Sequence, residues 1–149
     1  MRALVLAVLL CGCQSLTEGD CQRLLTGARP TLTRVRERLG AIARALPTQD
    51  FTRGRDDARA FATQLADDVN ALEQVKPRRE GLRTAWLALT SEIVEIRLAL
   101  GNVANAYESL RADATDARAA AELTAELEHL RASFADYARA GAQFDALCR

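Results

Sequence analysis

The sequence contains few of the residues that favour sheets or irregular loops. Aromatic residues occupy only 5% of the 149 positions, and there are 8 glycines, 3 prolines and a single histidine. Alanine and leucine are frequent instead, with 29 and 22 occurrences. Because these two residues favour helices, and an all-β chain needs more β-branched and aromatic residues, the composition predicts an all-α protein.

The sequence also lacks a net charge, because its 20 basic residues are balanced by 20 acidic residues. A protein that binds nucleic acid through the phosphates needs an excess of basic side chains, so we expect no nucleic-acid partner. The length, together with a hydrophobic content of 49%, suits one domain that buries a core of its own.

The N-terminal segment has a basic residue, Arg2, followed by an uninterrupted apolar run from Ala3 to Leu10. A positive start and a short apolar run are typical of a secretory signal peptide. These eight residues are too few to span a bilayer, which needs about 20. We therefore expect residues 1–12 to be a signal peptide that is removed, and no transmembrane helix in the rest of the chain.

The signal region ends in Leu10-Cys11-Gly12-Cys13, which resembles the lipobox of bacterial lipoproteins. In that family an aliphatic residue, a tolerant position and a small residue precede the cysteine that is lipidated. The resemblance implies cleavage before Cys13, acylation of Cys13 and attachment to a lipid bilayer, with residues 13–20 as a tether. Cys11 fits less well because the bulky Leu10 occupies its small-residue position. The alternative is an ordinary signal peptide with two chance cysteines.

Gln14 follows the lipidated position, where an aspartate would imply retention in the inner membrane of enterobacteria-like species. The resemblance therefore implies a place in the bacterial cell envelope, anchored to the outer membrane and facing the periplasm. Two or three acyl chains would make a stable anchor, because a single chain binds a membrane only marginally.

Residues 21–149 contain four amphipathic segments whose apolar residues are spaced three and four apart. Short polar turns are expected at 47–50 and 113–116, and Pro77 is expected in the first turn of the third helix. Within the first segment, Pro30 should kink the helix or begin a second piece of it. Four helices joined by short turns predict an antiparallel, up-down-up-down four-helix bundle. The third segment has the most regular stripe, Leu82, Trp86, Leu89, Ile93, Ile96, Leu100, Val103, Tyr107 and Leu110. The fourth stripe is Ala120, Leu123, Leu127, Leu130, Phe134, Tyr137, Gly141, Phe144 and Cys148.

The expected helices differ in charge. Residues 21–46 contain six arginines and one glutamate, a net charge of +5, whereas residues 50–75 and 112–149 each have a net charge of −3. In an up-down bundle the first helix neighbours the second and the fourth. The run of Arg34, Arg36 and Arg38 is therefore expected to be a solvated, partly ion-paired face.

Two cysteines lie at the ends of the bundle domain. Cys21 opens the first stripe and Cys148 closes the fourth, and an up-down bundle places these two positions at the same end of the molecule. In the oxidising compartment outside the cytoplasm, this placement predicts a Cys21–Cys148 disulfide. In the chain-entropy treatment, so long a loop would stabilise the fold by about 4–5 kcal/mol. The alternatives are two buried thiols or a bridge between chains.

Residues that could carry catalysis or hold a cofactor are scarce. The single histidine forms the pattern Glu126-x-x-His129, which di-iron bundles use in pairs together with two further carboxylates. One chain supplies one such unit, so we expect a solvated flank, with no metal and no cofactor. Ser133 is expected at the surface and not in a nucleophilic triad. Gly101 and Gly141 are assigned to close helix packing. We expect no enzymatic activity.

The third helix has a second apolar stripe that the bundle core does not explain. On a helical wheel, Leu87, Val94 and Leu98 fall opposite Leu89, which is in the middle of the core stripe. Such a stripe contacts a partner or a second copy of the chain, is covered by a loop, or is simply exposed. Leu87, Val94 and Leu98 are therefore candidates for partner binding.

These features predict a membrane-anchored, non-enzymatic helical-bundle lipoprotein that binds or scaffolds a protein partner or associates with itself. In size and anchoring the chain is similar to pilotin-like escorts of secretion-channel subunits, although no sequence motif carries that likeness. The alternative is a small-ligand or metal-binding periplasmic bundle that uses its interior, with Glu126 and His129 as the metal-binding candidates.

Overall fold

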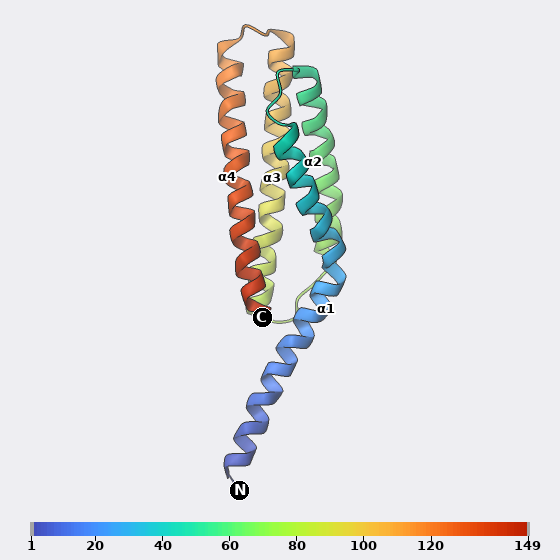
Figure 1. Cartoon of the computed structure of the whole chain (residues 1–149), viewed down its shortest axis with the longest axis vertical. Coiled ribbons are helices and arrows are strands. Elements are labelled where there is room, and N and C mark those ends of the chain that lie inside the picture. The colour runs from blue at the N-terminus through green and yellow to red at the C-terminus, as the bar shows by residue number, and fades with distance from the viewer. Residues whose placement is uncertain (1, 149) are drawn as a thin grey trace.

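The computed structural model describes the backbone of residues 2–148 and the side chains of residues 19–148. This part of the chain forms four α-helices and no strands (Figure 1). They are α1 (Arg2–Ala45), α2 (Phe51–Glu73), α3 (Glu80–Ala112) and α4 (Ala117–Leu147). The all-α class and the four helices of the sequence analysis are confirmed. The side chains of the signal segment 1–12 and of Cys13 lie outside the described residues.

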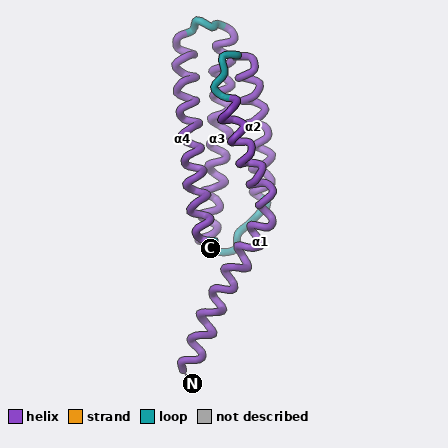
Figure 2. The backbone as a smooth tube through the Cα atoms, viewed as in Figure 1, coloured by secondary structure: helices purple, strands orange, loops and turns teal. Residues whose placement is uncertain are grey.

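Short segments connect the helices. Residues 46–50 and 113–116 lie at one end of the molecule, and residues 74–79 lie at the other end, near the C-terminus (Figure 2). The two predicted turns are confirmed, but the position predicted for Pro77 is wrong. Pro77 lies buried in the 74–79 segment and α3 begins only at Glu80, because the chain must first cross from α2 to α3.

The helix α3 is the best-packed element. It packs along both α2 and α4, whereas α1 packs mainly on α2 and makes no comparably extensive contact with α4. All nine residues of the core stripe predicted for α3 are buried. Trp86 contacts Phe144 of α4, with ring centroids 5.5 Å apart. The core therefore lies around α3.

The buried face of α4 differs from the predicted stripe. Ala119 is buried and Ala120 is exposed, and Ser133 is buried although the sequence analysis placed it at the surface. Leu127 and Phe134 are only partly buried. The difference follows from the packing, because α4 is pressed against α3 and less closely covered on the side that faces α1.

The helix α1 passes through Pro30 without interruption. Figure 1 shows that it changes direction about midway along its length. Proline has no N–H to donate to the carbonyl of Thr26, so the helix bends most easily at this turn. The sequence predicted either a kink at Pro30 or a second, separate helix beginning there. The structure has one continuous helix, so the second outcome is wrong.

Gly54 allows α2 to approach α3 closely. A Cβ atom at this position would lie 2.6 Å from Cζ of Tyr107, too close for any real contact. The Tyr107 hydroxyl accepts a hydrogen bond of 3.0 Å from the backbone N–H of Thr48, which ties the 46–50 segment to α3. Gly101 was expected to serve such an approach, and that prediction is wrong because nothing lies within 4 Å of its added Cβ.

Candidate functional site

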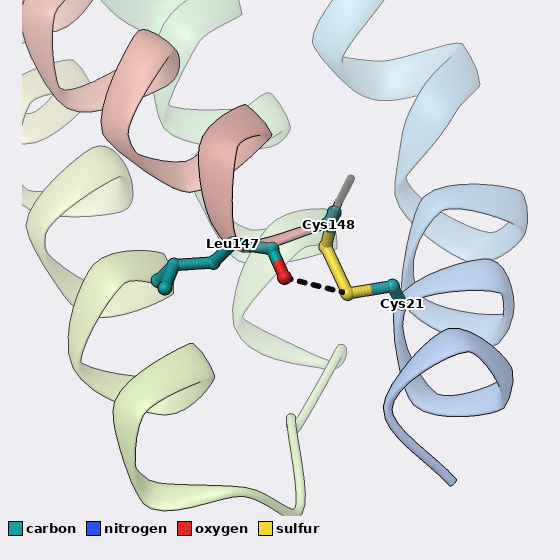
Figure 3. The surroundings of a disulfide bond; sticks show 3 residues. All are labelled: Cys21, Leu147 and Cys148. Carbon is teal, nitrogen blue, oxygen red and sulfur yellow. Dashed lines mark hydrogen bonds between the residues drawn. A yellow bond between two sulfur atoms is a disulfide. The ribbon is translucent and has the colours of Figure 1, made fainter. Parts of the chain in front are cut away.

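A disulfide joins the two ends of the bundle domain. Cys21 of α1 and Cys148, which follows the last residue of α4, are bonded, with their Cα atoms 5.4 Å apart (Figure 3). Cys21 is buried, and its Sγ lies 3.7 Å from the carbonyl oxygen of Leu147. The predicted pairing within one chain is confirmed. It fastens α1 to α4, two helices that otherwise have little contact.

The second apolar stripe of α3 is exposed in part. Leu87 is 59% exposed and Leu98 is 50% exposed, whereas Val94 is half-buried and packs against the core. The alternative in which a loop covers the stripe is wrong for Leu87 and Leu98. Two leucines three helical turns apart thus present apolar side chains to the surroundings.

Glu126 and His129, the metal-binding candidates of the alternative function, do not converge with other ligands. Glu126 accepts a 3.3 Å hydrogen bond from the side-chain amide of Asn102 on α3, and His129 is exposed. Among residues 19–148, no group of three or more His, Cys, Asp or Glu side chains is placed to hold a metal ion. The buried hydroxyl of Ser133 donates to the carbonyl oxygen of His129, at 3.1 Å.

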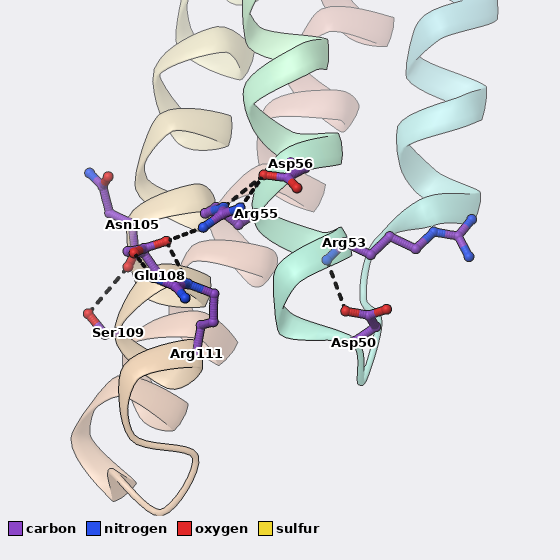
Figure 4. Close-up of polar contacts among 8 residues, drawn as sticks. All are labelled: Asp50, Arg53, Arg55, Asp56, Asn105, Glu108, Ser109 and Arg111. Carbon is purple, nitrogen blue, oxygen red and sulfur yellow. Dashed lines mark hydrogen bonds and ion pairs between the residues drawn. The ribbon is translucent and has the colours of Figure 1, made fainter.

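A charged network joins α2 to α3 near the 113–116 turn (Figure 4). Glu108 accepts hydrogen bonds from Arg111 of its own helix and from Arg55 of α2, at 2.6 and 2.8 Å. These two guanidinium groups lower the pKa of Glu108 to about 2. The carboxylate is therefore ionised at neutral pH and cannot serve as a general acid.

The arginines of α1 lie in two different environments. Arg34 and Arg38 reach Asp68 of α2, with Nε to carboxylate oxygen distances of 3.3 and 3.2 Å. Asp68 is only 2% exposed. The predicted partly ion-paired face is therefore confirmed for these two arginines. Arg36 lies instead at a cavity between α1 and α4.

This cavity has a volume of 360 Å³ and lies between α1 and α4, which make few contacts with each other. A second cavity of 120 Å³ lies farther along the same pair of helices, between Ile42 and Leu46 of α1 and Leu127 and Phe134 of α4. The partly buried residues of the predicted α4 stripe thus face cavities and not a packed helix. The lining of the larger cavity includes Leu32, Arg36, Leu89, Tyr137, Phe144 and Asp145.

Gly141 also lines the larger cavity. The prediction that close helix packing explains this glycine is wrong, because an added Cβ would be 3.9 Å from Cδ1 of Leu89, an ordinary contact distance. Nearby, burial raises the pKa of the Tyr137 hydroxyl, which the neighbouring Arg36 partly offsets. The hydroxyl is protonated at neutral pH and available as a hydrogen-bond donor. No local pattern in the sequence indicates this cavity.

Comparison with known proteins finds no match for this chain among protein-family models, curated proteins or solved structures. No helix in the described part of the chain is both long enough and apolar enough to cross a membrane. The two candidate sites are therefore defined by geometry alone: the exposed leucines of α3 and the cavity between α1 and α4.

Proposed function

We propose that the protein is a lipid-anchored, non-enzymatic helical bundle of the bacterial cell envelope that binds or scaffolds another protein through α3. The observation that carries the proposal is the exposure of Leu87 and Leu98 on a helix whose other faces are buried in the core. The resemblance of residues 10–13 to a lipobox supports acylation of Cys13 and attachment to the outer membrane on its periplasmic side.

The proposed bundle is antiparallel, with its helices in up-down-up-down order. Connections of four to six residues support this order, since the helices are 23 residues or longer. A 23-residue helix is about 35 Å long, and so short a segment cannot return along it to place the next helix parallel. The alternate ends at which the connections lie agree with this order.

The proposed anchor lies close to the disulfide in sequence, because Cys13 precedes Cys21 by only eight residues. The end of the bundle with the disulfide would then face the membrane, and the opposite end would point into the periplasm. A pilotin-like or chaperone-like escort would use such an arrangement, holding its partner at a fixed distance from the bilayer.

A second candidate function is the binding of a small ligand by the bundle. The 360 Å³ cavity between α1 and α4 favours it, because ligand sites are apolar concavities with a few polar groups. No comparable observation supports metal binding by Glu126 and His129. Glu126 instead accepts a hydrogen bond from Asn102.

Crosslinked co-purification from the native envelope tests the docking proposal, with the wild type compared with Leu98→Glu. We expect the wild type to capture a distinct partner and the variant to lose it, because the introduced carboxylate would be desolvated at the interface. Leu147→Glu is a matched control, since Leu147 is also 50% exposed but lies at the end of α4. Unchanged melting temperatures would show that both variants fold.

Three results would argue against this surface or this partner. Equal capture by the wild type and Leu98→Glu would exclude the α3 surface, and capture of only a second copy would indicate self-association. The absence of any capture by a folded, anchored protein would remove the support for docking.

A further inference from the structure

The cavity between α1 and α4 has the features of a small-molecule site. Its volume of 360 Å³ is within the range of about 300–1,000 Å³ for ligand pockets. Leu32, Leu89 and Phe144 supply an apolar lining from three different helices. The lining would remove the apolar part of a ligand from water, which is the main source of affinity for such groups.

Gly141 increases the space in this cavity. It lies inside α4, where glycine is less favourable than alanine because the flexible backbone loses more entropy in a helix. A Cβ would meet Leu89 only at 3.9 Å, so no close approach of helices requires a glycine here. The effect of the missing side chain is therefore a deeper cavity.

Two opposite charges lie on the same lining. Arg36 belongs to α1 and Asp145 to α4, and neither forms an ion pair within the described residues. Both act on the hydroxyl of Tyr137: the arginine lowers the pKa of this group and the aspartate raises it, on top of a larger increase caused by burial. A positive and a negative side chain are thus close to one buried hydroxyl.

We propose that the cavity binds a small zwitterion that carries an apolar group. The anionic part of the ligand pairs with Arg36 and its ammonium group pairs with Asp145, while its apolar group fills the space beside Gly141. Arg36 is exposed and Asp145 is half-buried, so both charges are accessible at the edge of the cavity, and a ligand with only one charge would make only one of the two contacts. The inference rests on ligand binding, the second candidate function above, and it is independent of the lipid anchor and of docking on α3.

The same chemistry occurs in a free hydrophobic amino acid and in a single-chain phosphoethanolamine lipid. Isothermal titration with L-phenylalanine and with submicellar lysophosphatidylethanolamine distinguishes these two sources. The full chain with Cys13→Ser is the sample, because it carries no acyl chain and needs no detergent. We expect one of the two zwitterions to bind. If it is L-phenylalanine, N-acetyl-L-phenylalanine and L-phenylalaninamide, which each lack one charge, should bind at least tenfold more weakly.

Substitutions in the cavity locate the site. Gly141→Leu should fill the space and weaken binding at least tenfold without lowering the melting temperature. Gly101→Leu is the matched control, since it makes the same change in α3 at a position with open space, and it should bind like the wild type. Arg36→Gln and Asp145→Asn should each weaken binding at least tenfold because each removes one charge contact.

A neutral apolar dye, N-phenyl-1-naphthylamine, tests whether the cavity binds any apolar ligand at all, independently of whether that ligand must be a zwitterion. If the dye enters the wild type but not Gly141→Leu, and neither zwitterion displaces it, the cavity binds ligands and the proposed class is wrong. If neither zwitterion nor the dye binds, both the inference and the ligand-binding function are overturned. Zwitterion binding that persists in Gly141→Leu would place the site elsewhere and overturn the proposal.

Discussion

Asp68 is a buried carboxylate whose charge is balanced by two arginines of a neighbouring helix. Only 2% of it is exposed, and Arg34 and Arg38 lie within 3.3 Å of its oxygens. A carboxylate removed from water without partners is strongly unfavourable, so these contacts favour the arrangement in which the arginines of α1 face α2. Nη1 of Arg38 and Oδ2 of Asp68 are both buried and form no hydrogen bond within the described residues.

We expect Asp68→Ala to lower the free energy of unfolding by about 1–3 kcal/mol, because it leaves the half-buried Arg38 guanidinium without its counter-charge. Asp67→Ala is the matched control, since Asp67 is the exposed neighbour, and it should change stability by less than about 0.5 kcal/mol. Urea denaturation of the two variants measures the difference. Equal losses would show that the contact with α1 contributes nothing.

The helices differ in which groups accept hydrogen bonds from the free backbone N–H groups of their first turns. Asp116 caps α4 by accepting hydrogen bonds from the backbone N–H groups of Arg118 and Ala119, at 2.9 and 3.1 Å. Asp50 caps α2 in the same way through Arg53. The residue before α3, Arg79, makes no capping hydrogen bond with its side chain. The ends of α2 and α4 at the 46–50 and 113–116 connections are therefore fixed by local side-chain contacts, and α3 relies on its packing.

Asp116→Ala should lower the free energy of unfolding by about 1 kcal/mol, because two N–H groups of α4 lose their acceptor. Glu128→Ala, an exposed change in the middle of the same helix, should have little effect because alanine is itself a good helix former. Thermal unfolding followed by circular dichroism would measure both. A smaller loss for Asp116→Ala than for Glu128→Ala would contradict the capping role.

On the scale of the whole molecule, the disulfide compensates for the sparse packing between α1 and α4. The helix α1 packs mainly on α2, and two cavities lie on its α4 side. The bond between Cys21 and Cys148 closes a loop with a sequence separation of 127. Such a loop restricts the unfolded chain and keeps α1 near α4 in the folded one.

Replacing both cysteines with serine should lower the free energy of unfolding by up to about 4–5 kcal/mol. Because α1 has the fewest other contacts, hydrogen exchange should accelerate more in its backbone amides than in those of α3. Reduction of the wild type should reproduce both effects. An unchanged exchange pattern in α1 would mean that its contact with α2 is sufficient to hold it.

Features that depend on the sequence of a single segment were predicted correctly. The four helices, the turns at 47–50 and 113–116 and the core stripe of α3 followed from spacing and composition, because periodicity is a property of each segment alone. The stripe of α3 was complete because neighbours cover this helix on two sides. The pairing of Cys21 with Cys148 was also predicted, since an up-down bundle would place both at the same end.

The contacts between helices were decided by the tertiary structure. Gly54 has no local feature that indicates its contact with Tyr107, and the stripe of α4 could not show which neighbour would cover it. The cavity beside Gly141 lies between α1 and α4, which make few contacts with each other. The sequence by itself thus determined where helices form and which faces are apolar. The distance between two helices depends on which side chains meet across them, and only the folded chain brings those side chains together.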